Sequence, residues 1–235
     1  MNSIWIGFDS REVDAFVVAK ESLKAHNRTN IPVKGILMSD QKALNNYTRP
    51  YRKIVGSLFD EISQAAMSTE FALTRFLTPI LAKSGWALFC DCDVMFRSEV
   101  EELFLLADNR YAIMCVKHEH KPKELVKMDN QLQQPYARKN WSSVMLFNCD
   151  HPSNKRLTLP LINSKKGSDI HAFCWLEDHE IGELGIEWNY LIGYSNDEVE
   201  PKLVHFTLGV PSMLGCENSP YSSEWREYLH KWARE

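Results

Sequence analysis

The sequence predicts an α/β fold, a sandwich with a mostly parallel central sheet flanked by helices. Short apolar runs of strand length alternate along the chain with segments of helical periodicity. One run, WALFC at 86–90, is apolar at nearly every position, as expected of a strand that is covered on both faces. No stretch is rich enough in Gly or Pro to form a linker, so we expect one domain over residues 1–235.

Six apolar runs predict strands, because each is short and is followed by a polar residue or a change of periodicity. The first, SIWIGF, ends at Asp9, and the third, WALFC, ends at Asp91. In chain order the predicted strands are residues 3–8, 31–38, 86–90, 111–116, 143–147 and 202–206.

Apolar residues at intervals of three and four predict the helices between these strands. Ser68 is a candidate N-cap for the second helix, and Pro79 is expected to kink it. The last helix carries an apolar stripe that we expect to pack on the body of the protein: Trp225, Tyr228, Leu229 and Trp232. In chain order the predicted helices are residues 13–23, 68–81, 99–106, 176–184 and 222–235.

Composition excludes several classes of protein. With 44% hydrophobic residues the chain can form a core, and 27 basic against 31 acidic side chains give a net charge of −4, so nucleic acid is disfavoured as a partner. No apolar run approaches the roughly 20 residues of a membrane span. Residues 1–10 lack the pattern of a signal peptide, so we do not expect export. The 6 cysteines do not resemble a disulfide framework, so we expect reduced thiols in a cytoplasmic protein. The sequence makes no prediction of the oligomeric state.

The strongest chemical signal is Asp91-Cys92-Asp93, directly after the buried run WALFC. In extended backbone, side chains two residues apart lie on one face, so both carboxylates can reach one cation. Ligands of open α/β sheets collect beyond the carboxyl ends of the strands. His205, at the end of the last apolar run, is a candidate third ligand. Mixed carboxylate and imidazole ligation favours Mn²⁺ over Mg²⁺.

The chain resembles the GT-A nucleotide-sugar glycosyltransferases, and most closely the retaining group (family eight) that contains glycogenin and the lipopolysaccharide galactosyltransferases. The resemblance covers roughly residues 3–210 and rests on the order of short motifs. They are Ile4–Phe8 with Asp9, Thr74-Arg75-Phe76, WALFCDCDVMF, NWSSVMLFN, Asp178, Trp188-Asn189 and VHFTLG.

The resemblance implies a role for each matched residue. A metal bridged to the donor diphosphate would be held by Asp91, Asp93 and His205. Asp178 matches the acidic residue that contacts the sugar in the reaction cleft. The residues expected to line the donor site are Gly7, Phe8, Asp9, Arg11, Arg75, Cys92, Asn140, Ser142 and Ser143.

The chain departs from the family pattern at two places. The asparagine before the middle strand, Asn140, is displaced by one position. No lysine follows Gly209, where the family has one that binds the diphosphate. Arg11 or a lysine of the 117–139 loop is expected to take that role.

These observations predict a metal-dependent glycosyltransferase that moves a sugar from a nucleotide-diphosphate donor, expected to be a UDP-sugar, with retention. The acceptor would be a carbohydrate, a lipid-linked molecule or another small molecule selected by the loop 117–141. Two alternatives stay open. In a haloacid-dehalogenase-like phosphatase Asp91 would be the nucleophile and Asp93 the acid/base. The other is a nucleotide-sugar binder without catalysis.

Overall fold

The computed structural model describes residues 1–54, 56–119, 138 and 140–234. Its centre is a six-stranded sheet in which three of the five described pairings are parallel. Strand β9 runs antiparallel to both of its neighbours. Across the sheet the strands are β10 (Ile181–Glu183), β8 (Ile113–Cys115), β9 (Val144–Asn148), β6 (Trp86–Cys90), β1 (Ser3–Gly7) and β2 (Val33–Ile36).

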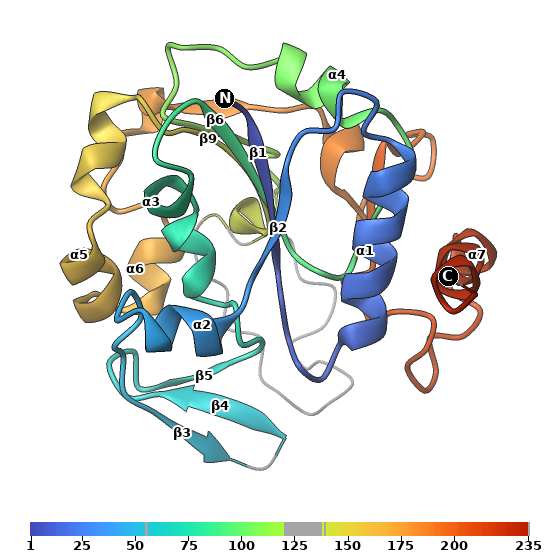
Figure 1. Cartoon of the computed structure of the whole chain (residues 1–235), viewed down its shortest axis with the longest axis horizontal. Helices are drawn as coiled ribbons and strands as arrows, with labels where there is room; N and C mark the ends of the chain where they lie inside the picture. Colours follow the sequence, from blue (N-terminus) through green and yellow to red (C-terminus); the bar gives the residue numbers. More distant parts are fainter. Residues whose placement is uncertain (55, 120–137, 139, 235) are drawn as a thin grey trace.

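Helices cover both faces of this sheet, which confirms the predicted α/β sandwich. In Figure 1, α1 (Val13–Ala25) and α7 (Ser222–Trp232) lie on one side. On the other side lie α3 (Thr78–Ala82), α5 (Leu159–Ser164) and α6 (Gly167–His171). Two further short helices are α2 (Met38–Ala43) and α4 (Val100–Leu105). Every residue of β9 is buried, and so is β6 after Trp86, as the continuous apolar run predicts.

A second sheet continues the chain beyond the two aspartates. Strand β7 (Val94–Phe96) begins directly after Asp93 and pairs antiparallel with β12 (Leu203–His205), which also pairs with β11 (Tyr190–Leu191). In this register His205 is the partner of Val94. Strand β12 is predicted from the sequence, whereas β7 and β11 are not. It is the pairing of these strands that places the histidine next to the aspartates.

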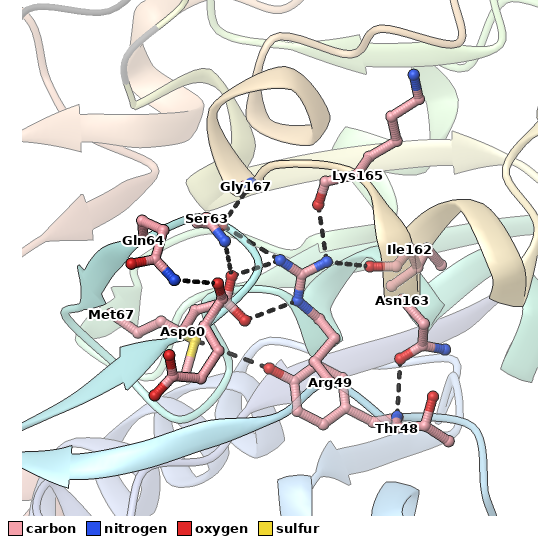
Figure 2. A network of polar contacts seen from close by, with 12 residues as sticks. Thr48, Arg49, Asp60, Ser63, Gln64, Met67, Ile162, Asn163, Lys165 and Gly167 are labelled. Carbon is pink, nitrogen blue, oxygen red and sulfur yellow. Dashed lines mark hydrogen bonds and ion pairs between the residues drawn. The ribbon is translucent and has the colours of Figure 1, made fainter.

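A third sheet of two hairpins was also missed: β3 (Tyr51–Ile54), β4 (Ser57–Asp60) and β5 (Ala65–Met67). A buried ion pair joins it to the end of α5. Figure 2 shows the Arg49 guanidinium between the Asp60 carboxylate and the backbone carbonyls of Ile162 and Lys165. The Arg49 guanidinium thereby caps the C-terminal end of α5, where helix carbonyls lack partners within the helix.

Two predicted helices are wrong in part. Residues from Ser68 form turns, and helical structure begins only with the 3-10 helix η1 (Thr74–Leu77) and continues as α3. Pro79 does not kink a helix, because it lies in the first turn of α3, where its missing N–H has no partner to lose.

The helix predicted over residues 176–184 is a single 3-10 turn, η4 (Asp178–Glu180), followed by β10. Gly182 allows β10 to lie close to β8. A side chain there would place its Cβ 2.6 Å from the Tyr111 ring, so only glycine allows this close pairing with β8.

The C-terminal helix is confirmed as α7, and it packs against α1 (Figure 1). Trp225 is fully covered, and Tyr228 and Leu229 are partly covered, as the apolar stripe predicts. Trp232 differs, because half of it is exposed. Among the described residues, no helix has both the length and the apolar character needed to cross a membrane.

Candidate functional site

The three predicted metal ligands meet at one point. Asp91 and Asp93 follow the last residue of β6, and His205 ends β12. One ligand atom from each lies within 4.8 Å of those of the other two. Backbone hydrogen bonds fix the segment, from Asp91 N–H to Ser143 O at 2.9 Å and from Phe206 N–H to Asp93 O at 2.8 Å.

The chemistry of these side chains fits a divalent cation. The Oδ1 atoms of Asp91 and Asp93 are buried and have no well-aligned hydrogen bond within the described part of the chain. Each has one cationic or ionisable neighbour instead: Arg75 Nη1 at 2.9 Å from Asp91, and His205 Nε2 at 3.3 Å from Asp93. Two carboxylates and one imidazole suit a cation such as Mn²⁺.

The pKa values of the two aspartates are shifted in opposite directions. Burial, together with the charge of Asp93, raises the pKa of Asp91 to about 7, and Arg75 offsets part of this. Burial also opposes ionisation of Asp93, but His205 outweighs it and holds the pKa of Asp93 below its usual value. The two carboxylates therefore repel each other, and a divalent cation between them would favour the ionised form of both.

Arg75 lies beneath the site and is almost fully buried. Besides its contact with Asp91, its Nη1 donates a hydrogen bond to the carbonyl of Ser142 at 2.8 Å. The rings of Phe71 and Phe89 lie about it, with centroids 5.2 and 5.3 Å from the guanidinium carbon. Arg75 thus holds Asp91 and the turn before β9 together.

Asn189 is a site residue whose role the sequence analysis missed. Its Oδ1 accepts a hydrogen bond from His205 Nδ1 at 2.9 Å, and its Nδ2 donates to Ser143 Oγ at 2.9 Å. The side chain is fully buried. The pair Trp188-Asn189 is visible in the sequence as part of the family resemblance, but nothing in it indicates this contact.

The Asp9 carboxylate is completely enclosed and its hydrogen-bonding capacity is used within the protein. It accepts from the backbone N–H groups of Arg11 and Glu70, both at 2.9 Å, and from the Arg11 guanidinium. Arg11 also donates to the carbonyls of Gly56 and Ser68. These contacts connect the loop after β1 to the loops at residues 56 and 68–70. They leave Asp9 no free acceptor directed at a donor molecule.

Gly7 and Phe8 also have packing roles at the end of β1. A Cβ on Gly7 would lie 2.5 Å from the Phe71 ring, so a larger residue does not fit there. Phe8 packs edge-on against Phe16, with ring centroids 5.1 Å apart.

Glu12 is an acidic residue near the site that was not predicted from the sequence. Its carboxylate accepts a hydrogen bond from Cys92 Sγ at 3.4 Å. Burial raises the pKa of Glu12 to about 7, and the charge of Asp93 contributes. Cys92 is fully buried, so the residue between the two aspartates is packed into the protein.

The turn before β9 contains Asn140, Ser142 and Ser143. Asn140 has a left-handed backbone with φ of 66°, which asparagine tolerates better than most residues. Its carbonyl accepts from Ser143 Oγ at 2.7 Å. Ser142 Oγ lies 2.7 Å from His171 Nδ1. The three residues are thus brought next to Asp91, Arg75 and Asn189.

A cavity of about 760 Å³ opens beside this turn. It lies beyond the C-terminal ends of β8 and β10 and against β11. Lining residues include Lys117, Asn140, Glu183, Leu191 and Tyr194. Residues 120–137 and 139, most of the loop to which the sequence analysis assigned acceptor specificity, lie outside the described residues.

Asp178 lies apart from the metal ligands. It precedes the N-terminal end of β10, and its side chain is 91% exposed and paired with Arg138. In the part of the chain described, no hydrogen bond or ion pair joins it to Asp91, Asp93 or His205. Arg138 also donates to the Ala172 carbonyl. Its guanidinium carbon lies 5.4 Å from the centre of the Trp141 ring, and Lys117 lies near the same ring.

Comparison with known proteins gives one relative by sequence. Protein CDI of Arabidopsis thaliana is 37% identical to this chain over 238 residues, which covers 99% of the chain and 87% of the relative. No family model matches the sequence.

Solved glycosyltransferases share the fold at low sequence identity. The bifunctional glycosyltransferase WbbM superposes with a TM-score of 0.60 at 14% identity over 97% of this chain, which spans about half, 49%, of that protein. The galactosyltransferase LgtC, solved with donor and acceptor sugar analogues, superposes with a TM-score of 0.58 at 12% identity over 98% of this chain and 96% of its own. The chain therefore has a GT-A-like fold.

Proposed function

This chain belongs to the same protein family as Protein CDI of Arabidopsis thaliana, and from its GT-A-like fold we propose that it is a metal-dependent glycosyltransferase. The reaction would move a sugar from a nucleotide-diphosphate donor, a UDP-sugar, to an acceptor hydroxyl. The observation that carries the proposal is the meeting of Asp91, Asp93 and His205 at the C-terminal edge of a GT-A-like sheet. We also propose that residues 1–235 act as one domain and, from six free cysteines, that the protein is cytoplasmic.

The bond between the anomeric carbon and the diphosphate oxygen would break, and the leaving group would take the bonding electrons. The acceptor oxygen would form the new bond to that carbon, and its proton would pass to the released diphosphate. Asp91, Asp93 and His205 would hold the cation, which as a Lewis acid stabilises the charge of a leaving diphosphate. Arg75 would keep Asp91 in position through its 2.9 Å contact. No general-base duty falls on the two aspartates.

On the donor side, the end of β1 at Gly7 and the loop that begins with Phe8 would border the base and ribose. Because Asp9 and Arg11 are engaged with each other, we assign them to the shape of this loop. The backbone at Cys92 and the turn of Asn140, Ser142 and Ser143 would lie along the sugar and phosphates.

The acceptor would occupy the cavity of about 760 Å³. That volume is within the range of pockets for small molecules, and the lining combines apolar residues with Lys117, Glu183 and Tyr194. A hydroxyl-rich acceptor suits such a lining. The role of Asp178 at the donor sugar rests on the family resemblance alone, and the same resemblance favours retention of configuration.

The experiment is a panel of nucleotide sugars tested with Mn²⁺ and with a chelator. A donor that binds the folded protein should raise its melting temperature only in the presence of the metal. The same donor should then yield free nucleoside diphosphate, slowly without acceptor. Asp93→Asn should abolish both effects, whereas Asp108→Asn, in an exposed pair with Arg110 before β8, should change neither. Binding without any release of diphosphate would instead support a non-catalytic binder, and release of phosphate from simple esters would support a phosphatase.

A further inference from the structure

A chain of hydrogen bonds connects His205 to the turn before β9 through a single side chain. Asn189 ends the 3-10 helix η5 (Ile186–Asn189) and is fully buried. Its Oδ1 lies 2.9 Å from His205 Nδ1. Its Nδ2 lies 2.9 Å from Ser143 Oγ and 3.5 Å from the carbonyl of Asn140. Both polar atoms of the amide are therefore used.

The direction of these hydrogen bonds is determined by the last one. The Ser143 hydroxyl donates to the carbonyl of Asn140 at 2.7 Å, so its oxygen is free to accept from Asn189 Nδ2. A flipped Asn189 amide would place its oxygen next to the Asn140 carbonyl, and two acceptors would face each other. The amide oxygen consequently faces His205, and Nδ1 of the imidazole must carry the proton.

This proton position leaves the lone pair on the other nitrogen. In the neutral ring that metal binding requires, this nitrogen is Nε2, which lies 3.3 Å from Asp93 Oδ1. A partner that holds the far nitrogen of a ligating histidine sets its tautomer and ring orientation. Asn189 is suited to this, because an amide can accept from the ring on one side and donate to the turn on the other.

We propose that Asn189 is a positioning residue, which fixes the His205 tautomer that binds metal and connects it to the turn at 140–143. The inference rests on the proposed metal site. Its consequence is that the metal ligand and the turn expected to contact the sugar share one hydrogen-bonded unit. A change at Ser143 should therefore alter the affinity for the metal, although Ser143 is not among the ligands.

The test uses the full chain and Mn²⁺ followed by electron paramagnetic resonance. Asn189→Leu has nearly the same size and no hydrogen bond, and it should weaken Mn²⁺ binding by about 10–100-fold, the range for loss of such a partner. The nitrogen coupling of His205 in the pulsed spectrum should weaken or vanish with it. Asn189→Asp keeps the acceptor for Nδ1 and should retain the coupling, but its second oxygen faces the Asn140 carbonyl and should lower the melting temperature. Ser143→Ala should lie between the two.

Asn154 provides the matched control, because it is also a buried asparagine but bonds the carbonyls of Ala112 and Asn148, away from the ligands. Asn154→Leu should lower the melting temperature and leave the Mn²⁺ affinity and the nitrogen coupling of the folded protein unchanged. A folded Asn189→Leu with wild-type affinity and coupling would overturn the inference and leave the metal site standing. A wild type that binds no Mn²⁺ would overturn both.

Discussion

The guanidinium of Arg75 lies 2.9 Å from Asp91 Oδ1, inside the protein rather than at its surface. A buried arginine and a proposed metal would therefore share one carboxylate. Arg75 cannot turn outward to bind a donor without leaving Asp91 unpaired and the Ser142 carbonyl without its donor. We expect it to act on the reaction through Asp91.

This arrangement predicts a metal-dependent rescue. Arg75→Met removes the charge but keeps an apolar side chain between Phe71 and Phe89, and the loss of one partner from a buried pair costs about 3–5 kcal/mol. Since a cation would then be the remaining counter-charge for Asp91, Mn²⁺ should raise the melting temperature of the variant more than that of the wild type. Arg97→Met, in a pair with Glu200 and Glu224, is the control and should show the wild-type shift. Equal shifts in all three proteins would contradict the prediction.

Asp178→Asn tests whether this acid takes part in the chemistry. Because the side chain is exposed, the variant should fold normally and bind the nucleoside diphosphate within a few-fold of the wild type. Turnover, or donor hydrolysis without acceptor, should fall by about a hundredfold or more, the scale seen when one charge-stabilising group is lost. Steady-state release of nucleoside diphosphate measures it.

Glu177→Gln and Glu180→Gln are the neighbouring controls. Glu180 accepts from Arg156 and from the backbone of Glu177, so its change should lower stability rather than turnover. If Asp178→Asn turns over like the wild type while Glu177→Gln does not, the assignment of this segment is wrong.

Removal of one partner from the buried pair of Arg49 and Asp60 should be strongly destabilising (Figure 2). Asp60→Asn leaves the Arg49 charge buried without a counter-ion, which should lower the free energy of unfolding by about 3–5 kcal/mol. Urea unfolding followed by circular dichroism measures this. Arg52→Gln breaks the exposed pair with Glu61 and should change the free energy by less than about 1 kcal/mol. Similar effects of the two changes would contradict the ranking.

His171 should make stability depend on pH. Burial, with a contribution from the Arg75 charge, lowers the pKa of His171 from its ordinary 6.5 to about 3. The unfolded chain therefore binds a proton first as pH falls, and stability is lost from about pH 6.5 downward. Between pH 7 and pH 5 the loss from this group is about 2 kcal/mol. His171→Gln does not titrate and should show a correspondingly shallower dependence in urea unfolding, whereas an unchanged slope would contradict the assignment.

The parts of the fold that could be predicted are those with strong apolar patterns. WALFC at 86–90 identified a covered strand, and a polar pair directly after it identified the position of Asp91 and Asp93. The same logic found His205 at the end of its strand. The strands β7 and β11 were missed because two or three residues show no periodicity. The hairpins β3 to β5 were missed because β3 and β5 are largely exposed and the alternation of buried residues in β4 extends over only four positions.

The parts of the site that could not be predicted depend on contacts distant in sequence. A lone asparagine such as Asn189 has no pattern that points to His205, 16 residues away. Likewise, Asp9 was expected to line the donor site, and nothing in the sequence indicates that its carboxylate is enclosed by Arg11 and the backbone of Glu70. Burial of Glu12 beside Cys92 also follows only from the folded arrangement.

The most direct test of the central claim is calorimetry of UDP binding with and without Mn²⁺, on the wild type, Asp91→Asn and Asp93→Asn. Since the two aspartates would hold the cation that meets the diphosphate, the wild type should bind UDP far more tightly with Mn²⁺ than with a chelator. Both variants should lose this difference while circular dichroism shows that the fold is kept. Unchanged Mn²⁺-dependent binding of UDP in both folded variants would contradict the account.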